Sequence, residues 1–166
     1  MVVQNGSELD FDENKIIVSK TDTSGKITYG NSLFIELSGY SEEELIGKPH
    51  NIIRHPQMPK LIFKLLWDYI KVGKEINAYV INLAKSGASY WVFANVTPSF
   101  DTNGKIIGYY SVRRKAKKQV IENIIKPLYS KLLDIEKRGG VNEAETYFKN
   151  ILKEKGLDYD EFILSL

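Results

Sequence analysis

The sequence of 166 residues contains no cysteine and only two histidines. The absence of cysteine excludes disulfide bonds, thiolate metal sites, iron–sulfur clusters, cysteine nucleophiles and a flavin held through a cysteinyl bond. The two histidines, His50 and His55, lie five residues apart with no third ligand in view, so we expect no zinc site. One histidine is enough for an axial haem ligand, which leaves haem open.

The sequence also lacks long apolar runs and a strong charge bias. No run approaches the roughly 20 residues of a membrane-spanning helix, and the N-terminus lacks the basic-then-apolar order of a signal peptide, so we expect a cytoplasmic protein. A net charge of +2 is too small to indicate nucleic-acid binding. The sequence has no Gly-rich phosphate loop and no Ser-His-Asp arrangement, so we expect no enzyme, with a small flavin oxidoreductase as the alternative.

The composition is that of an ordinary soluble protein, with 43% hydrophobic and 27% charged residues. The length suits one well-packed domain with an appendage. We divide the chain into an N-terminal extension (1–14), a central domain (15–115) and a C-terminal helical module (116–166).

Turn signals divide the central domain into short strands around a group of helices. One helix is predicted to begin after Asn31, a second in the capping box Ser41–Glu44, and a third at Met58 or Pro59. This order predicts an α+β fold, a five-stranded antiparallel sheet with short helices on one face, which can enclose a cavity. The strands are predicted at residues 16–18, 26–29, 77–84, 90–99 and 105–114.

The eleven residues from Pro49 to Pro59 hold both histidines and three of the five prolines. Proline fixes φ and removes a backbone donor, so this segment is predicted to be short and stiff, with Arg54 and His55 held in place. Stiff polar loops more often bind ligands than merely connect elements. We therefore expect a binding segment, with a surface connection as the alternative.

Short motifs run through the central domain at Gly25–Tyr29, Asn31–Phe34, Ser38–Tyr40, Glu44–Gly47, Met58–Pro59, Trp67, Gly87 and Tyr90–Val92. The most restricted motif is Pro-His-Asn at 49–51 with Arg-His-Pro at 54–56. Together they resemble PAS sensor domains, and specifically the PAS domain of the Aer aerotaxis receptors. The resemblance covers roughly residues 15–115, and the length is similar to that of small stand-alone PAS proteins of the CetB type.

The resemblance implies FAD bound without a covalent bond in the cavity, with its redox state signalled to a membrane chemoreceptor. Asn82 matches the family asparagine that hydrogen-bonds the ring edge. Arg54 and His55 match positions that support FAD binding, with Arg54 in the anion-binding role. Asn51 belongs to the Pro-His-Asn motif. The apolar slot for the ring is expected from Phe34, Leu37, Phe63 and Trp67.

Two positions depart from the family pattern. Gln57 stands where the family has an aspartate, which leaves more positive charge beside Arg54. Ile76 stands where the family has a tryptophan beside the flavin, and loss of that ring removes about 1 kcal/mol of stacking beyond area burial. The alternatives to FAD are therefore a cofactor-free interaction module, with an empty or differently filled cavity, and a haem-binding PAS domain.

Several residues also have purely structural interpretations. Trp67 lies on the apolar face of its helix, where core packing accounts for it equally well, and Asn82 can simply satisfy a strand end. At least one of Tyr90 and Trp91 is predicted to lie on the open face of the sheet, as part of an interaction patch.

Beyond residue 113 the sequence becomes basic and then helical. Five of the six residues in 113–118 are basic, which fits a solvated helix start, acidic lipid or an acidic receptor surface. Residues 141–166 hold three lysines and six acids, a net charge of 3 − 6 = −3, and could contact this basic stretch. Pro127 and Gly139-Gly140 are predicted to interrupt the helices. An apolar seam follows Ile121, Ile125, Leu128, Leu132 and Ile135.

A last short helix is predicted to begin at Asp158. The helical tail is expected to be an output module that docks on the PAS domain, on a second copy in a homodimer, or on the receptor, with a stabilising helical cap as the alternative. We expect a redox change of FAD to shift Asn82 and its strand. The contact between the sheet and a partner then changes by a few kcal/mol.

Overall fold

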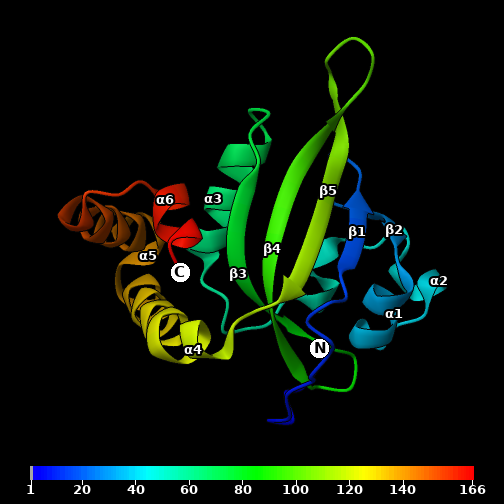
Figure 1. Ribbon diagram of the computed structural model, residues 1–166, viewed down its shortest axis with the longest axis horizontal. Helices are drawn as coiled ribbons and strands as arrows, with labels where there is room; N and C mark the ends of the chain where they lie inside the picture. The colour runs from blue at the N-terminus through cyan, green and yellow to red at the C-terminus, as the bar shows by residue number, and fades with distance from the viewer. Residues whose placement is uncertain (1) are drawn as a thin grey trace.

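Five antiparallel strands form a single sheet in the computed structural model, which describes residues 2–166 (Figure 1). The strands are β1 (Ile17–Thr21), β2 (Ile27–Gly30), β3 (Ile76–Leu83), β4 (Ser89–Phe100) and β5 (Ile106–Lys115). Their order across the sheet is β2-β1-β5-β4-β3, so β2 and β3 are the two edges. The predicted α+β fold with a five-stranded antiparallel sheet is confirmed.

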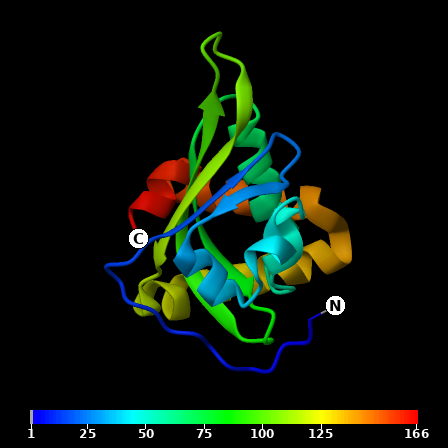
Figure 2. The same cartoon turned by 90° about the vertical axis from the view of Figure 1, so that its right-hand side faces the viewer.

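Short helices between β2 and β3 lie on one face of this sheet (Figures 1 and 2). They are α1 (Ser32–Ser38), α2 (Glu42–Leu45), the 3₁₀ helix η1 (His50–Ile53) and α3 (Lys60–Ile70). The predicted caps are present, because the side chain of Asn31 accepts from the backbone N–H of Phe34, and Ser41 and Glu44 form a capping box. The segment from Pro49 to Pro59, predicted to be stiff, contains one helical turn, η1.

Neighbouring residues of β4 face opposite sides of the sheet. Tyr90 and Val92 are fully buried in the cluster that contains α1. Trp91 faces the other side, where its ring lies 6.1 Å from that of Tyr129 in the C-terminal module. The predicted open patch at Tyr90 and Trp91 is therefore wrong, because Trp91 is only 8% exposed under the chain's own tail.

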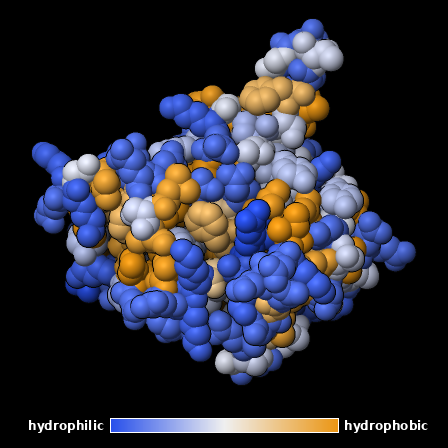
Figure 3. All heavy atoms as spheres, in the orientation of Figure 1, coloured by the Kyte–Doolittle hydropathy of each residue, from blue (hydrophilic) through white to orange (hydrophobic). Residues whose placement is uncertain are grey.

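The hairpin formed by β4 and β5 projects beyond the body of the molecule (Figures 1 and 3). Phe100 and Ile107 lie on this hairpin near its turn, and each is about half exposed. Exposed apolar side chains of the sheet are thus found near the hairpin tip and not at the predicted position.

The C-terminal module begins as one helical run with two interruptions. A π-helical turn, η2 (Ile121–Ile125), separates α4 (Lys118–Val120) from α5 (Lys126–Lys155) and leaves Pro127 in the first turn of α5, as predicted. Gly140, at φ 82° and ψ −177°, breaks the helical backbone of α5 where Gly139-Gly140 was predicted to interrupt it. Both predicted break points are therefore confirmed.

The tail covers the outer edge of β3 (Figure 1). The hydroxyl of Tyr129 on α5 donates to the carbonyl of Tyr79 at 2.6 Å. The hydroxyl of Tyr159, the first residue of α6 (Tyr159–Leu164), donates to the carbonyl of Asn77 at 2.8 Å. An uncovered edge strand is a template for pairing with other chains, so these contacts close the sheet. The tail was expected to dock on the central domain, on a second copy or on a receptor. In the structure it docks on the central domain.

Two further contacts tie this edge together. The backbone N–H of Ile81 donates to Met58 Sδ at 3.4 Å. The carboxylate of Glu136 on α5 accepts from the backbone N–H groups of Lys60 and Leu61, at 3.0 and 2.8 Å. The first turn of α3 has no side-chain cap of its own, so a residue of the tail satisfies its free donors.

The basic stretch at 113–118 is not a continuous charged surface. Arg113 is 2% exposed and points into the domain. Lys115 pairs with Asp10 at 2.5 Å, because the N-terminal extension passes along one end of the sheet (Figure 2). Among the ion pairs of residues 2–166, none joins this stretch to the acidic residues of 141–166. The two segments do meet, through a hydrogen bond of 3.4 Å from Nζ of Lys117 to the carbonyl oxygen of Leu166, but the acidic side chains of 141–166 take no part in this contact.

The hydroxyl of Tyr129 can be tested by Tyr129→Phe. This change leaves the buried carbonyl of Tyr79 without its partner, so we expect the free energy of unfolding to fall by about 1–3 kcal/mol. Urea unfolding followed by circular dichroism measures it. Tyr147→Phe, at a half-buried position on the same helix, is the control and should change stability by less than about 0.5 kcal/mol. Equal losses in the two variants would contradict the role of the hydrogen bond.

Candidate functional site

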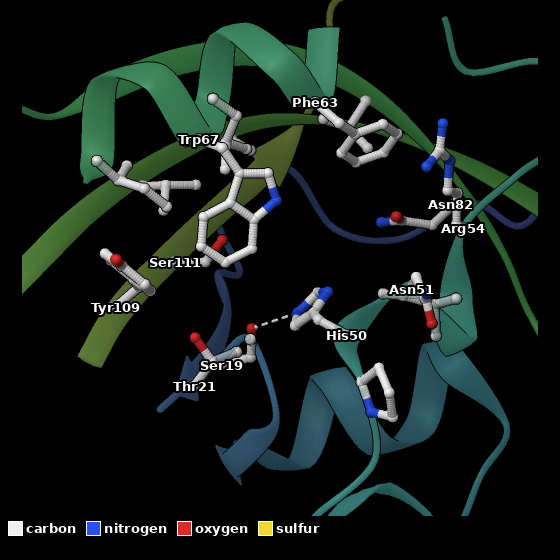
Figure 4. Close-up of a pocket in the computed structure, with 18 of the residues that line it drawn as sticks. Ser19, Thr21, His50, Asn51, Arg54, Phe63, Trp67, Asn82, Tyr109 and Ser111 are labelled. Atoms are coloured by element: carbon white, nitrogen blue, oxygen red, sulfur yellow. Dashed lines mark hydrogen bonds between the residues drawn. The ribbon is translucent and has the colours of Figure 1, made fainter. Parts of the chain in front are cut away.

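A cavity of about 280 Å³ lies between the sheet, α3 and the segment around η1 (Figure 4). Its apolar walls include Phe63 and Trp67 from α3 and Val80 and Ala94 from the sheet. Polar side chains enter from β1, β3, β5 and η1. Aromatic walls with a few polar groups are the usual character of a small-molecule site.

The indole of Trp67 is held in place by its neighbours. Its ring packs edge-on against Tyr109, with 5.5 Å between centroids and 85° between planes. Gly25, at φ 83°, lies so close that a Cβ atom there would be 3.3 Å from the indole. Glycine at this turn therefore lets the β1–β2 hairpin approach the ring that forms the cavity wall.

Arg54 lies beside Phe63 on one side of the cavity (Figure 4). Its guanidinium carbon is 4.1 Å from the centroid of the Phe63 ring, which is a cation–π contact. Burial lowers the pKa of Arg54, and the nearby carboxylate of Glu136 partly opposes that shift. Arg54 stays charged at neutral pH, with an aromatic and an acidic neighbour already supplied by the chain.

Asn82 lies on β3, and its backbone forms a β-bridge with that of Arg54. Its side chain lines the cavity and is 4% exposed, yet Nδ2 has no hydrogen-bond partner among residues 2–166. The buried hydroxyl of Tyr90, directly opposite on β4, is close enough for the amide of Asn82 to lower its pKa, but the two groups do not have the geometry of a hydrogen bond, and the hydroxyl has no other partner among residues 2–166. An unpaired buried donor costs about 1–3 kcal/mol. This wall therefore suits a ligand that accepts hydrogen bonds.

Arg113, Ser19 and His50 form a hydrogen-bonded series in another part of the cavity, and Figure 4 shows its link between Ser19 and His50. Nη2 of Arg113 donates to Ser19 Oγ at 2.5 Å, and Ser19 Oγ lies 2.9 Å from His50 Nε2. A guanidinium only donates, so Ser19 accepts from Arg113 and offers its own proton to Nε2. This assigns the proton of the neutral His50 ring to Nδ1.

Burial decides the charge states of His50 and Arg113. Burial first, and the nearby Arg113 second, lower the pKa of His50 to about 3, so the imidazole is neutral at pH 7. Burial lowers the pKa of Arg113 to about 10, so the guanidinium stays charged. The described residues that line the cavity include Arg54 and Arg113 but no aspartate or glutamate. The site therefore carries net positive charge.

The cavity brings together most of the residues predicted for the site. Five of them line it: Asn51, Arg54, Phe63, Trp67 and Asn82. Phe34 and Leu37, predicted as part of the slot, are core residues instead. The ring of Phe34 is fully buried and stacks on the imidazole of His50, with 5.7 Å between centroids.

His55 and Ile76 are predicted site residues that lie close to the cavity without lining it. His55 is 3% exposed, and its Nδ1 accepts from the backbone N–H of Gln57 at 3.1 Å, which organises the loop. Ile76 is opposite Val96, a cavity residue, but is itself fully buried in the core. Both side chains stay predicted site residues that border the cavity, and neither lines it.

Several polar residues of the cavity were not predicted as site residues, and three of them form the hydrogen-bonded series described above, namely Ser19, His50 and Arg113. The period of two along β5 places Tyr109, Ser111 and Arg113 on the cavity side. From the sequence, Arg113 was counted as one of five basic residues in 113–118. That count does not consider which face of the sheet a strand residue occupies, so the position of Arg113 at the cavity was missed. The alternation in β5 is the signal that identifies Arg113.

Within residues 2–166, no helix has both the length and the apolar character needed to cross a bilayer. The same residues contain no cluster of three histidine, aspartate or glutamate side chains that could bind a metal ion.

His50 makes the stability of the protein depend on pH. The pKa of His50 is about 3 in the folded protein and 6.5 for an unperturbed histidine, the value expected in the unfolded chain. Between these two values the unfolded chain binds more protons, so stability falls as the pH falls. We expect a slope of up to about 1.4 kcal/mol per pH unit from this residue, which His50→Gln removes. Urea unfolding between about pH 5 and pH 7 measures the slope. His55 is present in both proteins, so identical slopes would contradict the neutral state of His50.

Comparison with known proteins identifies related chains. Residues 27–113 match the family described as the PAS fold. The chain is 41% identical to the aerotaxis receptor of Escherichia coli (strain K12) over 120 residues, 72% of this chain and 23% of the receptor. It is 26% identical to the nitrogen fixation regulatory protein of Klebsiella pneumoniae over 103 residues, 62% of this chain and 21% of that protein. The chain thus spans less than a quarter of these two relatives.

Solved structures share the fold. The light state structure of the blue-light photoreceptor Aureochrome1 LOV matches with a TM-score of 0.59 and 23% identity, over 67% of this chain and 89% of that chain. A light-oxygen-voltage domain studied with a flavin analogue matches with a TM-score of 0.59 and 19% identity, over 70% of this chain and 87% of that chain. The family match covers more than half of the chain, and the sheet has the matching architecture. The chain therefore belongs to the PAS family.

Proposed function

We propose that the chain is a redox sensor that binds FAD in its PAS cavity and signals to a membrane chemoreceptor. The 41% identity to an aerotaxis receptor supports the signalling role, and the motifs at 49–51 and 54–56 support the choice of FAD. The proposal places the protein in the cytoplasm, beside the receptor, as a monomer or a homodimer. It includes no catalytic turnover.

The observation that carries this proposal is the unpaired Nδ2 of Asn82 at the wall of an apolar cavity. A flavin ring is flat and apolar across its faces and has carbonyl and nitrogen acceptors along one edge. Trp67 and Phe63 supply apolar walls for such a ring, and Asn82 supplies a donor that has no other partner. The residues present therefore fit the group.

The size of the cavity limits which part of FAD can enter it. About 280 Å³ is just below the range of roughly 300–1,000 Å³ for small-molecule pockets. This volume suits a ring system and is too small for a whole dinucleotide, so the phosphate-bearing part is expected outside the cavity. Arg54 is only partly buried and is the cationic residue proposed to interact with that part.

A bound flavin supplies reversible uptake of electrons. The chain binds and orients it, and its strand β3 connects the site to the tail. β3 carries Asn82 on the cavity side, while its carbonyls at Asn77 and Tyr79 accept from tyrosines of the C-terminal helices. A changed hydrogen bond at Asn82 therefore biases a strand that the tail holds. We expect the signal to pass through the tail, because the tail covers the face of Trp91.

The absorbance spectrum of freshly purified protein tests the proposal. Flavin absorbance, with FAD identified in the material released by heat, is the expected result. Protein purified without flavin is incubated with excess FAD, because an expression host poor in flavin can leave the cavity empty. A chain that stays colourless after this step is a cofactor-free module, and steady-state oxidation of a reduced nicotinamide would instead indicate a flavin oxidoreductase.

Asn82→Leu separates a binding role from a structural one. Leucine is similar in size and removes an unpaired donor, so we expect the ligand-free protein to be as stable as before or more stable. The affinity for FAD should fall at least about tenfold, because the ligand loses a hydrogen bond. Fluorescence titration measures affinity, and urea unfolding measures stability.

Asn95→Leu is the matched control for this change. The amide of Asn95 donates to Glu75 and Asn77 at 3.1 and 3.0 Å on the other face of the sheet. It should lower stability and leave FAD affinity unchanged. Loss of stability without loss of affinity in Asn82→Leu would refute the role of Asn82 as a ligand donor.

Arg54→Ala tests the anion-binding role of Arg54. Loss of the guanidinium is expected to weaken FAD binding about tenfold or more and to lower the flavin content of purified protein. Arg54→Lys keeps the charge and should retain more flavin than Arg54→Ala. Lys48→Ala, an exposed charge change on the loop before η1, is the control. Wild-type flavin content in Arg54→Ala would show that the assignment is wrong.

A further inference from the structure

Arg113 is a buried charge without an acidic partner. Its side chain is 2% exposed and lines the cavity, and no aspartate or glutamate lines the cavity among the described residues. Among residues 2–166, its one hydrogen bond to a side chain goes to the neutral hydroxyl of Ser19. Its Nε is buried and has no partner within residues 2–166.

Such a group is costly in a ligand-free protein. Moving an ion from water into a protein interior costs several kcal/mol, and a neutral hydroxyl does not neutralise a guanidinium. The ring of Phe34, 4.9 Å from the guanidinium carbon, adds a cation–π contact but no charge. A buried cation with a free donor in a cavity is the arrangement expected where a ligand supplies the negative charge.

The groups around Arg113 do not supply that charge. His50, reached through Ser19, is neutral at pH 7 and becomes a second cation when protonated. The hydroxyl of Tyr90 is the nearby group that could become an anion, and burial raises its pKa to about 12. Both groups therefore stay neutral at physiological pH, and the cavity keeps the positive charge of Arg113.

Arg54 differs from Arg113 in each of these respects. It is only partly buried, its guanidinium stacks on Phe63, and the carboxylate of Glu136 lies nearby. Its charge is thus partly compensated by the chain itself. A ligand charge that develops deep in the cavity meets Arg113, not Arg54.

We infer that Arg113 is the residue that compensates the negative charge of the reduced flavin ring, and so sets the potential at which the sensor changes state. This inference rests on the function proposed above. When an external low-potential donor supplies two electrons, the ring gains one proton at N5 and retains one negative charge at N1. The charge of Arg113 favours this anionic form over the neutral form that takes a second proton.

The potential of the bound flavin tests the inference. Wild-type protein, Arg113→Gln and Arg114→Gln are loaded with FAD and titrated anaerobically with a chemical reductant and redox mediators. In Arg113→Gln, the ratio of reduced to oxidised flavin at a fixed potential should fall at least about tenfold, which is about 30 mV for two electrons. Arg114→Gln removes an exposed charge from the next position of β5 and should match the wild type.

Arg113→Lys and a measurement on the wild type complete the test. Lysine keeps the charge, so its ratio should stay within about threefold of the wild type. If Arg113→Gln does not fold, the wild-type potential between about pH 5 and pH 6 decides. Uptake of one proton with two electrons changes the ratio about tenfold per pH unit, or about 30 mV, whereas two protons give about twice that shift.

The outcomes separate this inference from the proposed function. If the wild-type chain takes up no FAD, the proposed function is wrong, and the role of Arg113 is wrong with it. If FAD binds but Arg113→Gln keeps the wild-type potential, or the wild type takes up two protons in this range, only the role of Arg113 is wrong. A lowered potential in Arg113→Gln, with wild-type values in Arg114→Gln, supports both.

Discussion

The closure of strand β3 at its outer edge is the constraint on which the cavity depends. β3 is the last strand of the sheet and forms one cavity wall, so its outward carbonyl groups need partners that no further strand supplies. Tyr129 and Tyr159 supply them, from positions 50 and 82 residues further along the chain. The same module packs against α3, so one late segment of the chain holds both elements that enclose the cavity.

Unpaired polar groups in and beside the cavity lower the stability of the ligand-free protein. They include the uncompensated guanidinium of Arg113 and the unpaired amide of Asn82. Two apolar clusters offset this loss, one around α1 and β1 and one that joins α3 to the C-terminal helices. Because His50 stays neutral, the site carries its buried charge in one guanidinium. The residues that stabilise the domain are thus different from the polar residues that line its cavity.

The sequence predicted what local chemistry decides. Helix caps, turns and the alternation of side chains in strands depend on residues that are close in the sequence. The cap at Asn31, the break at Gly140 and the strands were therefore predicted. What failed depends on contacts between distant segments. Trp91 was expected in the open because nothing near it indicates that α5 folds back over the sheet. Arg113 was read as part of a basic run, although its strand turns it inward. Five predicted residues meet at the cavity, but that they bind a ligand stays a prediction.

The carboxylate of Glu136, which accepts from the first turn of α3, has a practical consequence for any minimal version of this sensor. A fragment cut after β5 keeps every side chain that lines the cavity, yet it frees two amide donors of α3 and two carbonyls of β3. The cavity of such a fragment is therefore enclosed by two elements that have lost hydrogen bonds present in the longer chain. A fragment that keeps the walls of the cavity as they stand here includes the C-terminal helices, because their side chains hydrogen-bond both α3 and β3.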